Sequence, residues 1–109
     1  MPGKDLVFFV QLHIKPERVE EWKRAVVALI DRMSQEDAFV KCLLDQSVED
    51  PHLFTLYERW REPSPEAFLK NQMKEYRRVY EEMLPGLLQT PRTAMILSPV
   101  REWHRQAAP

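Results

Sequence analysis

Apolar residues recur at two different spacings along this chain of 109 residues, and each spacing predicts one kind of element. Alternation over residues 6–14 places every second apolar side chain on one face, which is typical of a β-strand. Further extended runs cover residues 39–48 and 53–60, and turn-forming residues 49–52 join them as a hairpin. Residues 92–97 form the fourth predicted strand.

A spacing of three or four residues predicts two helices. Pro16 opens the first helix, and one apolar face of it carries Val19, Trp22, Val26, Leu29, Ile30 and Met33. Ser64 is the expected N-cap of the second helix, which starts at Pro65. The stripe expected to pack this helix on the sheet is Leu69, Met73, Tyr76, Tyr80, Met83 and Leu87. A bend is expected near Asn71 and Gln72, and Pro85 interrupts the helix near its end.

Alternation also assigns side chains to the two faces of each strand. In the third strand a carboxylate shares its face with three apolar residues, the full set being Phe54, Leu56, Glu58 and Trp60. In the second strand Val40, Cys42 and Leu44 are expected on one face. The opposite face of that strand is expected to carry Phe39, Lys41 and Leu43.

The order strand, helix, strand, strand, helix, strand predicts an α+β fold of the ferredoxin-like βαββαβ type. Its four-stranded antiparallel sheet would carry both helices on one face. The other face, with Val7, Phe9, Leu53 and Tyr57, is too apolar to leave in water, so we expect a homodimer formed sheet to sheet. We expect one domain over residues 1–109, with a core of about residues 5–98 and a tail at 99–109.

Charge and composition narrow the function classes. Sixteen Lys and Arg residues balance seventeen Asp and Glu residues, and no stretch concentrates positive charge, which argues against nucleic-acid binding. The apolar run at residues 6–10 is too short for a membrane span or a signal peptide. A lone cysteine, Cys42, fits a reducing compartment, so we expect a cytoplasmic protein. The histidines His13, His52 and His104 lie far apart along the chain, so no metal is expected.

Residues 56–60 read Leu-Tyr-Glu-Arg-Trp and are followed by Ala67-Phe68. This pattern resembles the Y-E-x-W and A-F signature of the antibiotic biosynthesis monooxygenase family, whose members are dimeric α+β barrels. The similarity spans most of the chain. It departs from the family where Asn71 replaces a histidine found in many members, and where Asp37 and Ala38 replace a glycine.

The resemblance implies oxidation of an aromatic phenol or quinol by molecular oxygen, without metal, flavin or haem, in a homodimer. Haem-degrading relatives use a strand asparagine, a tryptophan and a helix histidine. Trp60 matches the tryptophan, but Val10 or Gln11 stands near the asparagine position and no histidine follows Trp60 before His104, so haem degradation is not expected. Two alternatives stay open: an isomerase or decarboxylase on the same fold, and a non-catalytic small-ligand-binding dimer.

Four residues are candidates for catalysis, each with a structural alternative. Trp60 is expected to form a pocket wall and donate its N–H to a substrate oxygen, or else to be a core tryptophan. Glu58 among apolar neighbours suits general acid or base work, or an ion pair with a residue such as Arg92 or with a partner subunit. Asn71 would hold a substrate carbonyl or cap the bend, and His13 would be a base or an exposed histidine.

A second set of residues is expected to line the substrate pocket: Tyr57, Tyr76, Tyr80, Met73, Phe54 and Phe68. Tyrosine hydroxyls orient phenolic ligands, and methionines adapt to flat ones, although such side chains also serve as core. Cys42 is expected to be a small buried hydrophobe. The charged residues between 74 and 82 are expected to form a solvated helix face without a functional role.

Overall fold

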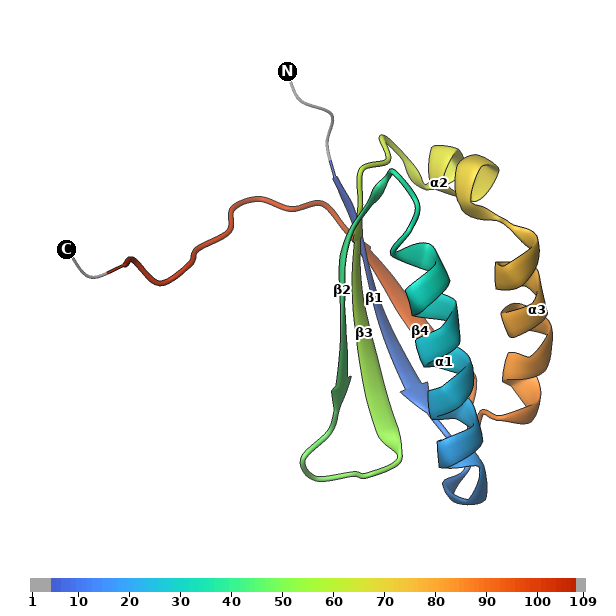
Figure 1. Cartoon of the computed structure of the whole chain (residues 1–109). Coiled ribbons are helices and arrows are strands. Elements are labelled where there is room, and N and C mark those ends of the chain that lie inside the picture. Colours follow the sequence, from blue (N-terminus) through green and yellow to red (C-terminus); the bar gives the residue numbers. More distant parts are fainter. Residues whose placement is uncertain (1–4, 108–109) are drawn as a thin grey trace.

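All helices of the described residues lie on one face of a four-stranded antiparallel sheet (Figure 1). The computed structural model describes residues 5–107. The strands lie side by side in the order β2-β3-β1-β4, and their bounds are β1 Leu6–His13, β2 Phe39–Gln46, β3 Leu53–Trp60 and β4 Thr93–Leu97. Each neighbouring pair is antiparallel, and β1 lies between β3 and β4. The α+β ferredoxin-like fold is therefore confirmed.

The first helical segment begins with a 3-10 turn at Pro16–Arg18 and continues as α1, Val19–Met33. The second predicted helix is divided into α2, Pro65–Gln72, and α3, Glu75–Met83, followed by a 3-10 turn at Leu84–Gly86. At the start of α2 the Ser64 hydroxyl accepts a hydrogen bond from the backbone N–H of Ala67 at 3.1 Å, as its predicted N-cap role requires.

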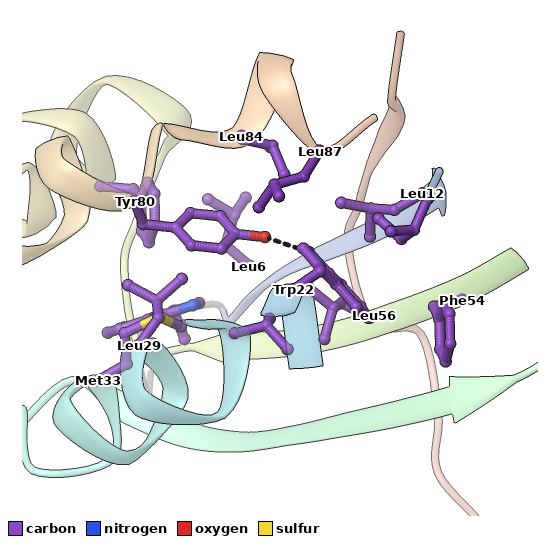
Figure 2. Packing of buried hydrophobic residues seen from close by; sticks show 14 residues of the cluster. Leu6, Leu12, Trp22, Leu29, Met33, Phe54, Leu56, Tyr80, Leu84 and Leu87 are labelled. Carbon is purple, nitrogen blue, oxygen red and sulfur yellow. Dashed lines mark hydrogen bonds between the residues drawn. The ribbon is translucent and has the colours of Figure 1, made fainter. Parts of the chain in front are cut away.

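The core lies between the sheet and the helices. Every second residue of β3 is buried there, as predicted, including Phe54, Glu58 and Trp60. Figure 2 shows how Trp22 of α1 and Tyr80 of α3 meet among buried leucines. Burial of these apolar side chains is the main source of stability in a domain of this size.

The structure corrects the predicted face of Phe39. A β-bulge lies between Phe39 and Lys41, so Phe39 pairs with Trp60 and Lys41 pairs with Arg59. The extra residue reverses the alternation, since one residue shifts every later side chain to the other face. Phe39 therefore packs edge-on against Trp60 in the core, with ring centroids 5.2 Å apart, instead of lying on the face of Lys41.

The predicted packing stripe of the second helix is also partly wrong. Leu69, Met73 and Met83 are 54%, 44% and 42% exposed. The helix stops at Gln72 and restarts at Glu75, so residues on the two sides of the break no longer share one face. Tyr80 and Leu87 of the predicted stripe are buried as expected, and they are joined by Phe68, Gln72 and Leu84.

No described helix covers the other face of the sheet, called the open face below (Figure 1). Its central residues Phe9 and Tyr57 are partly exposed, and Leu43 and Met95 are 50% and 58% exposed. The segment after β4 leaves the body on this side. The predicted tail runs to residue 109, and its last two residues lie outside the described ones. Within residues 5–107 no helix is long and apolar enough to cross a membrane.

Candidate functional site

A cavity of about 430 Å³ lies between the helix-facing side of the sheet and α1, α2 and α3. Strands β1, β3 and β4 contribute one wall, and the helices contribute the other. Most of its lining is apolar or aromatic: Phe8, Val10, Leu12, Leu29, Leu56, Phe68, Leu69, Met73, Tyr80 and Ala94. The polar exceptions are Glu58, Arg77, Glu81 and Arg92. A mostly apolar cavity with a few convergent polar groups is the usual form of a small-molecule site.

Glu58 is the most buried charged group of this cavity, with 7% of its surface exposed. Its Oε1 accepts a hydrogen bond from Trp60 Nε1 at 3.2 Å and lies 3.6 Å from Arg77 Nη2. Burial raises the pKa of Glu58, while the Arg77 charge and the Trp60 hydrogen bond act in the opposite direction. The charge partner is thus Arg77, and not the Arg92 considered from the sequence.

Arg92 instead forms a two-pronged ion pair with Glu81, with Nη1 and Glu81 Oε2 at 2.9 Å. Arg77 is fixed further by Phe68, because its guanidinium lies 5.1 Å from the centre of that ring. The cavity wall therefore carries two carboxylates and two guanidinium groups in close pairs. Such pairs shift proton affinities and mark candidate sites for acid–base chemistry.

The prediction that residues 74–82 form only a solvated face is wrong for Arg77 and Glu81. The Arg77 side chain is 11% exposed, and both residues line the cavity. Helical spacing contained part of the missed signal: Arg77 lies three residues before Tyr80 in α3, so both side chains face the cavity. Because Arg77 is charged, the spacing of the apolar residues did not reveal that it faces the cavity.

Three of the predicted pocket residues, Phe68, Met73 and Tyr80, line the cavity. Trp60 is fully buried and does not line it. Its ring packs against Phe68 with centroids 5.2 Å apart, and its N–H is already bonded to Glu58. The Trp60 N–H, which was expected to donate to a substrate oxygen, donates in this structure to the Glu58 carboxylate from behind the cavity wall.

Asn71 and His13, the other catalytic candidates, lie outside the cavity. Asn71 Nδ2 donates to the buried Glu62 at 3.0 Å, beside the break between α2 and α3. His13 Nε2 lies 3.0 Å from Asp50 Oδ2 at the hairpin end of the sheet. Neither side chain is brought near Glu58.

Three predicted pocket residues are also placed elsewhere. Phe54 packs under Trp22, with ring centroids 4.8 Å apart. Tyr57 lies on the open face, opposite Phe9 of β1 and Leu43 of β2. Tyr76 donates its hydroxyl to Glu36 Oε2 at 2.9 Å and lies outside the cavity lining.

Cys42 packs against the core from β2, as predicted for a small hydrophobe. Burial and the neighbouring Glu58 raise the pKa of its thiol to about 12, so the reactive thiolate is disfavoured. In the described part of the chain, no group of three or more His, Cys, Asp or Glu residues is placed to hold a metal ion.

Comparison with known proteins agrees with this fold and cavity. The sequence model of the antibiotic biosynthesis monooxygenase family matches residues 6–81. The chain belongs to this family. Family membership confirms the resemblance derived from the Glu58 and Trp60 region. No curated protein matches the chain significantly.

Solved structures support the same fold for this family member. PA3566 from Pseudomonas aeruginosa is 23% identical, with a TM-score of 0.79 over 93% of this chain and 99% of that chain. Rv0793 from Mycobacterium tuberculosis is 20% identical, with a TM-score of 0.79 over 90% and 97%. The structure of an antibiotic biosynthesis monooxygenase is 21% identical, with a TM-score of 0.77 over 88% and 99%. Identities this low carry the fold and not the substrate.

Proposed function

We propose that this chain is a cofactor-independent monooxygenase that oxidises an aromatic phenol or quinol with molecular oxygen. The observation that carries the proposal is the Glu58 carboxylate, which is buried yet lines an apolar cavity. A carboxylate in such surroundings has a raised pKa and suits proton removal from a phenol. The surrounding aromatic and methionine side chains suit a flat apolar ligand.

In the proposed reaction Glu58 accepts the phenolic proton, and the resulting electron-rich anion transfers one electron to oxygen. The two radicals combine to form a carbon–oxygen bond, the resulting peroxide anion takes the proton back from Glu58, and the hydroperoxide then loses water to leave the carbonyl group. For an anthrone, a CH₂ group and O₂ become a C=O group and H₂O, so one oxygen atom enters the product and the other leaves as water. Arg77 and Arg92 supply positive charge beside the developing anions.

We further propose that the protein acts as a homodimer in the cytoplasm. The open face leaves Leu43 and Met95 in contact with water, and a second copy of the same sheet would cover them. The segment that leaves the body on this side carries Trp103, which is 74% exposed and would gain burial in the same interface. A single cysteine, Cys42, suits the reducing conditions of the cytoplasm.

Oxygen consumption by chelator-treated protein tests the proposed reaction, with a panel of anthrones and dihydroxynaphthalenes as substrates. The wild type should consume oxygen faster than the substrates autoxidise. Glu58→Gln keeps an acceptor for Trp60 but removes the base, so its rate should fall by about 10²- to 10⁴-fold. Glu49→Gln, in the exposed hairpin turn, is the matched control. Equal rates for all three proteins would contradict the role of Glu58.

A proton-transfer reaction is the second candidate, because the Glu58–Arg77 pair is an acid–base group that needs no oxygen. An isomerase or decarboxylase would turn over its substrate equally fast under nitrogen. The monooxygenase would stop under nitrogen and resume when oxygen is returned. The same panel assayed under both gases therefore separates the two candidates.

A further inference from the structure

Tyr80 is a cavity-lining residue that carries an uncharged hydroxyl. It is 5% exposed, and it extends from α3 toward Trp22 of α1 (Figure 2). Trp22 Nε1 donates a hydrogen bond to the Tyr80 hydroxyl oxygen at 3.0 Å. Trp22 has no exposed surface, so no water competes for this N–H.

This contact fixes the role of the hydroxyl. An indole N–H can only donate, so the Tyr80 oxygen must be the acceptor, and its own O–H remains to be donated. Within residues 5–107 the Tyr80 hydroxyl donates to no acceptor. Tyr76 provides the contrast on the same helix, because its hydroxyl already donates to Glu36.

Tyr80 is one of the residues that line the cavity, and its hydroxyl lies at the Trp22 end of its side chain. Leu12, Leu29 and Leu56 line the cavity together with Tyr80, and they belong to the same buried cluster as Trp22. Burial raises the pKa of Tyr80 to about 12, so the hydroxyl keeps its proton at neutral pH. The charged groups of the lining already have partners, since Glu58 contacts Arg77 and Glu81 contacts Arg92.

We propose that the Tyr80 hydroxyl donates a hydrogen bond to an oxygen atom of the aromatic ligand in this cavity, and that Trp22 is the positioning residue that orients this donor. The inference deepens the proposed function and rests on the cavity being the substrate site. It assigns the ligand an oxygen, phenolate or carbonyl, at the Tyr80 end of the cavity. A donor at this place stabilises the phenolate more than the neutral phenol, because hydrogen bonds to ionised acceptors are stronger.

The ionisation of a bound phenol measures this donor directly. The probe is 4-nitro-1-naphthol, whose phenolate has its own visible absorption and which resists oxidation. Wild type, Tyr80→Phe, Trp22→Phe, the double variant and the control Tyr76→Phe are titrated with the probe across pH, after circular dichroism has checked their folding. Loss of the Tyr80 hydroxyl should raise the pKa of the bound probe by about one unit, a tenfold weaker preference for phenolate.

Trp22→Phe should raise the pKa of the bound probe in the same direction, and it should add nothing in the Tyr80→Phe background. Tyr76→Phe should leave the bound probe as in the wild type. A purely structural role of Tyr80 would weaken binding of both probe forms equally and leave the pKa of the bound probe unchanged. If Trp22→Phe does not fold, the comparison of Tyr80→Phe with Tyr76→Phe decides the donor by itself.

A failure of this inference can be distinguished from a failure of the proposed function. If the probe binds to the wild type and to Tyr80→Phe with the same bound pKa, the inference is overturned while the cavity keeps its proposed function. If neither the probe nor any member of the anthrone panel binds to the wild type, the cavity is not a phenol site. The proposed function and this inference then fail together.

Discussion

The indole N–H of Trp60 and the carboxylate of Glu58 are joined by a 3.2 Å hydrogen bond within a single strand. Residues two apart in a strand point to the same face, so β3 presents both side chains toward the helices. Glu58 reaches the cavity lining, whereas Trp60 stays fully buried behind it. The tryptophan therefore contacts the Glu58 carboxylate from behind the cavity wall.

Trp60→Phe should raise the pKa of Glu58 further. The Trp60 N–H favours the ionised carboxylate, so its removal leaves burial less opposed. The carboxyl ¹³C resonance of Glu58, followed by NMR across pH, reports this directly, and the acidic limb of oxygen uptake should move to higher pH with it. Tyr76→Phe, outside the cavity lining, is the control. An unchanged Glu58 titration would show that the hydrogen bond has no influence on the carboxylate.

Glu58→Gln should make the protein more stable at neutral and alkaline pH. The pKa of Glu58 is raised in the folded state, so the folded protein binds its proton more tightly than the unfolded chain does. Stability is then lost as pH rises from the ordinary glutamate range to the folded pKa, and glutamine has no such loss. Thermal unfolding should give the variant a melting temperature a few degrees higher at pH 8 and an equal one at pH 4. A lower melting temperature for the variant than for the wild type at pH 8 would contradict the predicted direction of the stability change.

Asp50→Asn should destabilise the hairpin end of the sheet at neutral pH and not in acid. The backbone N–H of His52 and the His13 ring hold the pKa of Asp50 below its ordinary value. A lowered folded pKa stabilises the protein above the unfolded pKa, and this stability is lost as pH falls through the folded value. The melting temperature should drop at pH 7, with the difference closing in strong acid. Asp45→Asn, at an exposed position of β2, is the control.

Leu43→Lys should convert the proposed homodimer into monomers. Leu43 is 50% exposed on the open face, and a lysine there would place a charge inside the proposed interface. Light scattering at micromolar concentration gives the mass directly. Val27→Lys, on a partly exposed position of α1 facing the other side, should leave the dimer intact. A wild-type mass of one chain would overturn the dimer.

The strands and their faces could be predicted wherever alternation is unbroken. The predicted bounds of β3, Leu53–Trp60, agree with the structure, and Glu58 was placed correctly among apolar neighbours. Phe39 was misplaced because a bulge depends on how two strands pair, which alternation within one strand does not contain. The split between α2 and α3 was anticipated at Asn71 and Gln72, but its effect on the packing of Leu69 and Met73 was not.

By itself the sequence determined which segments form strands and helices, which face of β3 carries Glu58, and that the sheet has helices on one side. The elements and their faces follow from the spacing of apolar residues, which is contained within each segment of the sequence, and the one-sided arrangement of the helices follows from the order of the elements. Only the tertiary structure decided that Arg77 of α3 faces Glu58, and that Tyr80 meets Trp22, 58 residues away. Such contacts join separate elements, and their partners depend on how the helices pack on the sheet, which no local pattern encodes.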